Sequence, residues 1–250
     1  MLEKLLKRGP LVVAHRGDPL VKPQNTRSSF LSAMQYDIDM IETDINMTKD
    51  GRLVIIHDQK VDNTSNGKGR VIDFTLSELL ELDFGSWMGE AFRGEKIMTF
   101  EEFIELTRDK VGALNIEVKS GRIKYQGIEQ KLVDTLKKYD MLDRALISSF
   151  DHPLLKRVKE IEPRLMTGVL YSGGLIDPLF PAILAGANAI NPEFQWVNAE
   201  MIDAAFFRGL FVNVWTVDDE NDMRDMVNLK VSSIISNFPG RLASVVKRKA

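Results

Sequence analysis

The sequence of 250 residues contains no cysteine. This absence excludes disulfide bonds, a cysteine nucleophile and thiolate ligands, so any metal site must be built from oxygen and imidazole ligands. Histidine is also scarce, with three residues in the chain. The positions of these few imidazoles are therefore informative about acid–base chemistry near neutral pH.

Long apolar runs and an excess of one charge are also absent. No uninterrupted apolar run approaches the roughly 20 residues that span a bilayer, and charges interrupt the opening MLEKLLKRGP too early for a signal peptide. The net charge is -3, which does not favour nucleic acid or an anionic membrane as the main partner. We therefore expect a cytoplasmic protein without transmembrane segments that binds a small molecule.

Eight apolar runs of strand length recur along the chain, each followed by a helical pattern. The runs begin at Leu11, Met40, Ala113, Ala145, Leu165, Ala187, Leu210 and Val231. Such alternation requires parallel strands joined by right-handed crossovers. Eight repeats in a chain of this length favour an α/β fold of the (β/α)8 TIM-barrel type, and a doubly wound open sheet is the alternative.

The alternation is interrupted once, after the second strand. Residues 58–98 contain turn-forming segments and a short helix in which Thr75 and Glu78 have the spacing of a capping box. We interpret this segment as a small insertion. No linker rich in Pro, Gly or Ser divides the chain, so we expect one domain over residues 1–250, ending in a helix from Leu242 to Lys249.

The stretch MIETDINMTKDGRLVIIHD, residues 40–58, carries the first candidate site. Glu42 and Asp44 are two apart in a predicted strand, so their side chains project from the same face. Two adjacent carboxylates repel each other unless a cation lies between them, and a divalent ion with oxygen ligands is the usual solution. The stretch ends in His57 and Asp58, close to where its hairpin begins.

Other polar residues fall at the carboxyl ends of predicted strands, where barrel enzymes carry their active sites. They are His15 and Arg16 on the first strand, Glu117 and Lys119 on the third, and Trp215 near the end of the seventh. Charged side chains inside a barrel must pair with one another, with a metal or with a ligand. Structural ion pairs are the alternative for Arg16 and Lys119, and a solvated strand face is the alternative for Glu42 with Asp44.

Together these positions favour a phosphate site built on a metal. Glu42, Asp44 and Glu117 can supply three oxygen ligands to Mg²⁺ or Ca²⁺, and Arg16 and Lys119 provide positive charge for a bridging anion. Two imidazoles, one on each side of a phosphorus centre, suit acid and base roles near neutral pH. His15 and His57 are the candidates, whereas His152 precedes Pro153 at a helix start and is interpreted as a loop or capping residue.

The complete set of motifs resembles the glycerophosphodiester phosphodiesterase family over nearly the entire chain. The family's HRG and Pro-Glu-Asn-Thr groups correspond to residues 15–17 and 23–26, its Glu-x-Asp, His-Asp and Glu-x-Lys patterns to 42–44, 57–58 and 117–119, and its Trp-Thr-Val to 215–217. The insertion, with its LDFGSW segment, resembles the family's small subdomain. Singly the motifs are weak, but in this order and at these spacings they are specific.

The resemblance implies a metal-dependent enzyme that hydrolyses glycerophosphodiesters, such as glycerophosphocholine or glycerophosphoethanolamine, to glycerol 3-phosphate and an alcohol. It implies a divalent ion, Mg²⁺, Ca²⁺ or Mn²⁺, on Glu42, Asp44 and Glu117. It further implies general acid–base catalysis by His15 and His57, phosphate binding by Arg16 and Lys119, and packing of Trp215 against the glycerol or the head group. Which histidine is the acid is left open.

The chain departs from the family pattern at two positions. Gln24 replaces the glutamate of Pro-Glu-Asn-Thr, and Asn237 replaces the aspartate of a Thr-Asp-Tyr-Pro group. Each change removes a carboxylate. If the lost glutamate contacts the metal shell or orients a histidine, metal affinity or activity should fall. We expect the metal still to bind, because its three carboxylate ligands are present.

Two other functions fit the same residues. One is a different lipid-related phosphodiesterase on this scaffold, such as a phospholipase D of the sphingomyelinase type, although those secreted enzymes usually rely on disulfides. The other is a weakly active sensor that binds a phosphodiester. The apolar pair Phe206 and Phe207 is either core or a subunit contact, so a homo-oligomer is an open alternative.

Overall fold

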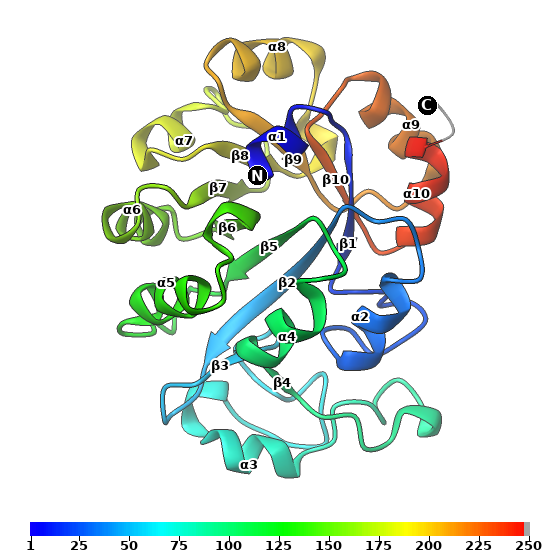
Figure 1. Cartoon of the computed structure of the whole chain (residues 1–250), viewed down its shortest axis with the longest axis vertical. Helices are drawn as coiled ribbons and strands as arrows, with labels where there is room; N and C mark the ends of the chain where they lie inside the picture. Colours follow the sequence, from blue (N-terminus) through cyan, green and yellow to red (C-terminus); the bar gives the residue numbers. More distant parts are fainter. Residues whose placement is uncertain (248–250) are drawn as a thin grey trace.

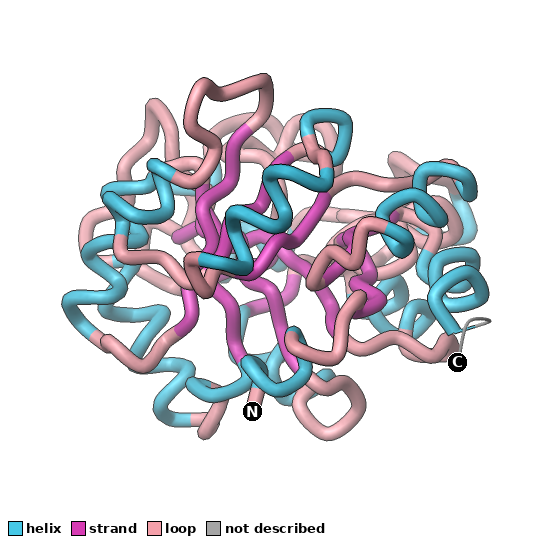
Figure 2. Tube along the Cα trace, turned by 90° about the horizontal axis from the view of Figure 1, so that it is seen from above, coloured by secondary structure: helices cyan, strands magenta, loops and turns pink. Residues whose placement is uncertain are grey.

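Eight parallel strands form a closed barrel in the computed structural model, which describes residues 1–247 (Figures 1 and 2). Strand β1 pairs with both β2 and β10, and this double pairing closes the sheet. The barrel strands are β1 (Leu11–His15), β2 (Met40–Met47), β5 (Ala113–Val118), β6 (Ala145–Ser149), β7 (Met166–Tyr171), β8 (Ala189–Pro192), β9 (Phe211–Val214) and β10 (Ser233–Ser236). The predicted (β/α)8 barrel is confirmed, and the open-sheet alternative is wrong.

Helices cover the outside of the barrel, and Figure 1 shows them as a ring around the strands. They are α2 (Arg27–Ala33), α4 (Phe100–Thr107), α5 (Ile128–Lys138), α6 (His152–Ile161), α7 (Phe180–Ala185), α8 (Ala199–Phe207), α9 (Glu220–Asn228) and α10 (Pro239–Lys247). The last helix begins three residues before the expected Leu242, and Lys249 lies outside the described residues. None of the helices within residues 1–247 combines the length and the apolar character that crossing a membrane requires.

Side-chain caps explain where several helices begin. The Thr26 hydroxyl accepts a hydrogen bond from the backbone N–H of Ser29, which starts α2 directly after the first strand and its loop. Thr99 and Glu102 form a capping box at the start of α4. Short polar residues at these two positions therefore fix where α2 and α4 begin and where the preceding loops end.

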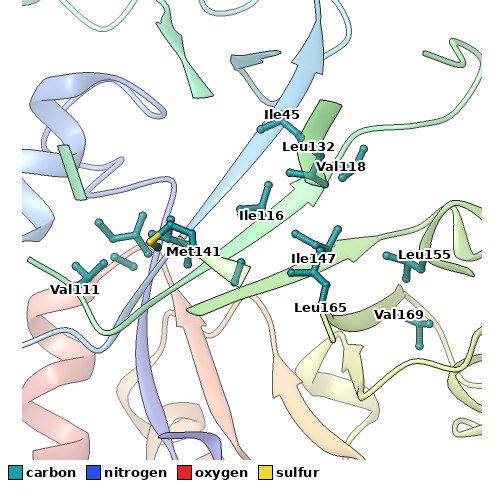
Figure 3. Packing of buried hydrophobic residues seen from close by; sticks show 14 of the residues in the cluster. Ile45, Val111, Ile116, Val118, Leu132, Met141, Ile147, Leu155, Leu165 and Val169 are labelled. Carbon is teal, nitrogen blue, oxygen red and sulfur yellow. The ribbon is translucent and has the colours of Figure 1, made fainter. Parts of the chain in front are cut away.

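The apolar residues form two layers, one between strands and helices and one inside the barrel. In the outer layer, Ile116, Ile147 and Val169 of neighbouring strands face Leu132 and Leu155 of the covering helices (Figure 3). Fully burying each such side chain contributes about 1.5–3 kcal/mol. This layer holds the helices against the strands.

The inner layer fills the amino-terminal end of the barrel. Helix α1 (Leu2–Leu6) lies across that end, and its Leu2 and Leu6 pack with Val13, Met40 and Leu146 inside the barrel. These buried side chains make this end of the barrel apolar. The charged side chains inside the barrel lie toward the opposite, carboxyl-terminal end, where strand-end residues face a cavity, whereas the neutral side chains of Asn191, Asn213 and Ser233 bond to one another within the barrel.

The sheet continues from barrel strand β2 into two further strands that flank the insertion. Strand β3 (Leu53–Ile55), antiparallel to β2, precedes the predicted insertion of residues 58–98, and β4 (Met98–Thr99), antiparallel to β3, ends it. Between them lie helix α3 (Leu76–Glu81) and the 3₁₀ turns Val71–Asp73 and Glu90–Phe92. The expected capping box of Thr75 and Glu78 is present. We propose that barrel and insertion form a single domain, because β3 is hydrogen-bonded to a barrel strand.

The apolar pair on α8 is not core. Phe207 is 91% exposed and Phe206 is 43% exposed. The core alternative for Phe207 is therefore wrong, and a homo-oligomer stays a prediction.

Candidate active site

The register of three neighbouring strands brings the predicted site residues together. His15 of β1 pairs with Glu42 of β2, and Asp44 of β2 pairs with Glu117 of β5. Alternate residues of a strand share one face, so all four side chains point into the barrel at its carboxyl-terminal end. Sequence positions far apart therefore converge on one small volume.

Three buried carboxylates form the centre of this volume. One oxygen each of Glu42, Asp44 and Glu117 lies within 4.8 Å of the others. Burial raises the pKa of Glu117 to about 7 and raises the pKa of Glu42 well above its usual range, with the Asp44 charge adding to the effect on Glu42. A set of hard oxygen ligands that holds protons near neutral pH fits a divalent cation, which would displace those protons.

Asp44 differs from the two glutamates because two cations contact it. Burial alone would raise its pKa, but the charges of Lys119 and Arg16 outweigh burial and lower the pKa. Lys119 Nζ lies 3.0 Å from Asp44 Oδ1 and 2.5 Å from Glu117 Oε1. Lys119 follows β5, which ends at Val118 rather than at the lysine as expected, yet its side chain still reaches the cluster.

Arg16 connects the cluster to the loop after β1. Its Nε lies 3.2 Å from Asp44 Oδ2, and its Nη1 donates a hydrogen bond of 2.8 Å to Gln24 Oε1. Gln24 therefore contacts the guanidinium and, within the described hydrogen bonds, neither a histidine nor a cluster carboxylate. The buried Asn25, which sequence reasoning did not single out, donates from Nδ2 to Asp44 Oδ2 at 2.8 Å.

The two candidate histidines have different partners. His15 Nδ1 lies 2.7 Å from Asn237 Oδ1, whereas His57 Nδ1 lies 2.6 Å from Asp58 Oδ1. Burial, with the Arg16 charge, lowers the pKa of His15 to about 4, and burial also lowers the pKa of His57. Both imidazoles are therefore neutral at pH 7, and each has a ring nitrogen, Nε2, that is not used by these partners.

A cavity of about 260 Å³ opens over these groups. Seven of the eight predicted site residues line it, and the eighth, Asp44, lies fully buried beneath them. Trp215 forms part of the wall, its Nε1 donating to the Asn191 carbonyl oxygen at 2.7 Å. Its ring meets Phe150 edge-on at 5.7 Å. Phe150 was missed from the sequence, although its place directly after β6 marks it as a strand-end residue.

Asn115 and Ser148 also line the cavity and were missed. The Ser148 hydroxyl donates to Asn115 Oδ1 at 2.9 Å. The inward register of β5 and β6 was the only signal that could have found them. The third histidine lies apart: His152 is the first residue of α6, and its Nε2 lies 2.8 Å from the Leu170 carbonyl oxygen.

Comparison with known proteins agrees with this constellation. Residues 15–241 match the sequence model of the glycerophosphoryl diester phosphodiesterase family. The chain belongs to this family. The resemblance found from the motifs is thereby confirmed, and with it the expectation of an enzyme.

Relatives in the family cover almost the whole chain. A glycerophosphodiester phosphodiesterase of Caldanaerobacter subterraneus is 43% identical over 95% of this chain and 98% of its own length. One of Bacillus subtilis is 33% identical over 95% of this chain and 86% of its own length. Among solved structures, an Oleispira antarctica phosphodiesterase in complex with the product sn-glycerol-3-phosphate has a TM-score of 0.86 at 27% identity, covering 97% of this chain and 98% of that one.

Within this phosphodiesterase fold, the two departures from the family motifs have local explanations. Gln24 keeps a hydrogen-bond acceptor for Arg16. Asn237 removes a carboxylate from direct contact with His15, but Asp218 of the β9 loop lies behind it and accepts hydrogen bonds from the Asn237 side chain and backbone. A carboxylate is therefore still present at this edge of the site, one residue further from the histidine.

Proposed function

We propose that this member of the family hydrolyses glycerophosphodiesters, such as glycerophosphocholine or glycerophosphoethanolamine, to glycerol 3-phosphate and an alcohol. The observation that carries the proposal is the convergence, around one cavity, of three buried carboxylates, two cationic side chains and two neutral histidines. This set suits a phosphodiester, because the cationic side chains can bind its negative charge and the histidines can transfer protons. The solved relative bound to sn-glycerol-3-phosphate supports the product.

The proposal includes a divalent ion, Mg²⁺, Ca²⁺ or Mn²⁺, held by Glu42, Asp44 and Glu117. Their oxygens are hard ligands, they are close enough to share one ion, and two of them have raised pKa values that a cation would reverse. When bound, such an ion neutralises phosphate charge and stabilises charge that develops in the transition state.

Arg16 and Lys119 bind the phosphoryl oxygens in this proposal. Lys119 has three N–H donors, and contacts with two carboxylates leave one for a ligand. Arg16 similarly has donors beyond those used by Asp44 and Gln24. Their positive charges keep the buried site near neutrality and so admit an anion.

His15 and His57 move protons. Because their Nδ1 atoms face Asn237 and Asp58, each presents Nε2 for exchange with the attacking hydroxyl or the leaving oxygen. Positioned acid–base groups contribute about 10²–10⁴-fold each to a rate. Trp215 and Phe150 form an apolar wall for the carbon atoms of the substrate.

The experiment that tests this function is release of glycerol 3-phosphate from both substrates, with and without a chelator. It compares the wild type, His57→Ala and the control His152→Ala, which removes an imidazole outside the cavity. We expect release that the chelator abolishes, that His57→Ala lowers at least 100-fold, and that His152→Ala changes only a few-fold.

The other outcomes separate the alternative functions. Hydrolysis of sphingomyelin or lysophospholipids in place of glycerophosphodiesters would indicate a different phosphodiesterase. Binding of a glycerophosphodiester without turnover, with any of the three ions, would indicate a sensor. The cytoplasmic location stays a prediction from the sequence.

A further inference from the structure

A chain of hydrogen bonds leads from His15 to a carboxylate that touches neither the substrate cavity nor the metal cluster. His15 Nδ1 lies 2.7 Å from Asn237 Oδ1, and Asn237 Nδ2 donates to Asp218 Oδ2 at 2.7 Å. Asp218 Oδ1 accepts from the backbone N–H of Asn237 at 2.8 Å and from the Ser236 hydroxyl at 3.1 Å. The two loops that follow β9 and β10 are thus joined through one aspartate.

The direction of each hydrogen bond follows from the aspartate. An ionised carboxylate only accepts, so the atom of the Asn237 amide that faces Asp218 must be Nδ2. Turning the amide over would place two acceptors 2.7 Å apart. The Asp218 carboxylate therefore fixes which end of the Asn237 amide is nitrogen and which is oxygen.

The amide orientation in turn selects a tautomer of His15. With Nδ2 held by Asp218, Asn237 presents Oδ1 to the imidazole, and an acceptor there requires the ring proton on Nδ1. The lone pair of neutral His15 then lies on Nε2, which is on the cluster side, 3.8 Å from Glu42 Oε2. Both His15 and Glu42 line the cavity.

We propose that Asp218 is a positioning residue for catalysis: through Asn237 it holds His15 as the Nδ1–H tautomer, so that Nε2 is kept as a proton acceptor at the reaction site. The inference rests on the proposed function in that His15 exchanges a proton with the substrate. His57, whose Nδ1 partner is the carboxylate of Asp58, is held by a charged group instead. The Nδ1 atom of His15 therefore has a neutral partner, whereas that of His57 has a charged one.

The substitution Asp218→Asn tests the series of hydrogen bonds at the residue that orients it. The new amide at position 218 keeps an oxygen for the Asn237 backbone N–H and the Ser236 hydroxyl, which turns its NH₂ group toward the Asn237 side chain. Asn237 must then turn over to accept, and its Nδ2 meets His15. We expect His15 to change to the Nε2–H tautomer and kcat to fall about 10–100-fold, with KM within about twofold.

A double substitution supplies the rescue. In Asp218→Asn with Asn237→Asp, the carboxylate and the amide exchange places. The carboxylate at position 237 accepts from His15 Nδ1 and from the new amide at position 218, so the Nδ1–H tautomer should return. We expect kcat within about threefold of the wild type, which a purely structural loss at position 218 would not allow.

The tautomer is read from long-range ¹H–¹⁵N correlations of the imidazole rings at a pH where His15 is neutral. His15→Gln assigns its signals among the three histidines. This reading needs no turnover, so it tests the inference even if the proposed activity fails. Asp225→Asn, which removes an exposed carboxylate on α9, is the matched control and should leave tautomer and kcat unchanged.

If Asp218→Asn does not fold, Asn237→Ala keeps the Asp218 contacts to Ser236 and to the backbone, and should give a mixture of both tautomers with a similar loss of kcat. A His15 that stays in the Nδ1–H form in both single variants, or an Asp218→Asn enzyme with the kcat of Asp225→Asn, would overturn the inference. So would a double variant no better than the single one.

Discussion

Lys119 Nζ lies 3.0 Å from Asp44 Oδ1, and the aspartate has no exposed surface. The lysine bonds to Glu117 as well, so one ammonium group serves two of the three carboxylates of the cluster. A buried carboxylate that loses such a partner is left with an uncompensated charge. The lysine therefore contributes to stability as well as to the proposed phosphate binding.

We predict that Lys119→Met lowers the free energy of unfolding by about 3 kcal/mol in the presence of a chelator, because breaking a buried ion pair leaves Asp44 underpaired. Mg²⁺ should restore part of that loss by supplying another cation. Lys124→Met is the control: Lys124 is paired with Asp151 but is largely exposed, so its loss should cost at most about 1 kcal/mol. Urea unfolding of both variants measures the difference, and equal stabilities would contradict the prediction.

The raised pKa of Glu117 predicts how stability depends on pH without metal. Burial raises that pKa from its ordinary 4.5 to about 7, so the folded protein binds the proton more tightly than the unfolded chain. The stabilisation is complete below pH 4.5 and is lost as the pH rises toward 7, a change of up to about 3 kcal/mol.

Unfolding titrations of the wild type and of Glu117→Gln from pH 4.5 to 7.5 in a chelator isolate this slope as the pH dependence of the difference in stability between the two proteins. The comparison is needed because the lowered pKa values of His15 and His57 act in the opposite direction in both proteins. With saturating Mg²⁺ the slope should reverse, because the ion binds only the deprotonated carboxylates. A wild type that loses no stability relative to Glu117→Gln as the pH rises would show that Glu117 is not protonated in the folded state.

Gln24 should affect substrate binding and leave metal affinity unchanged, because its oxygen bonds to Arg16 and to no carboxylate of the cluster in the described contacts. Removing an acceptor from a charged donor costs about 1.5 kcal/mol. We expect Gln24→Ala to raise KM about tenfold, with the Mg²⁺ dissociation constant within twofold of the wild type. Kinetics and calorimetry check the two halves, with the more exposed Gln35→Ala as the control. Weaker Mg²⁺ binding by Gln24→Ala would contradict the prediction and would indicate that Gln24 supports the metal site.

Gly17 of the HRG motif has a steric requirement that can be separated from its backbone conformation. Its φ is +91°, and a Cβ atom there would lie 2.4 Å from Ser29 Oγ and 2.7 Å from the Ser29 carbonyl carbon. Gly94 has nearly the same φ, +90°, with nothing within 4 Å. Both alanine variants carry the backbone cost of about 1–2 kcal/mol, but Gly17→Ala alone also overpacks α2. We expect it to be less stable than Gly94→Ala by about 1–3 kcal/mol in thermal or urea unfolding, and equal losses would exclude the clash.

Much of the site could be predicted from the sequence because it depends on local periodicity. Residues two apart on a strand share a face, so Glu42 with Asp44 and Glu117 with Lys119 could be paired without coordinates, and eight repeats of strand and helix imply a barrel whose strand ends meet. The structure places Glu42, Asp44 and Glu117 on the strands that this reasoning expects, whereas Lys119 follows the end of β5 and still reaches the cluster.

Only the tertiary structure decided which partner each polar side chain took. Asp218 and Asn237 follow adjacent barrel strands, β9 and β10, and they meet because the parallel pairing of those strands sets the register between them. Nothing in their local sequence indicates that one would orient the other. The same holds for Gln24, whose acceptance from Arg16 depends on how the loop after β1 folds back. Chemistry carried along a single strand was therefore determined by the sequence alone, whereas the hydrogen bonds of loop residues were determined by how neighbouring strands pair and how the loops after them fold.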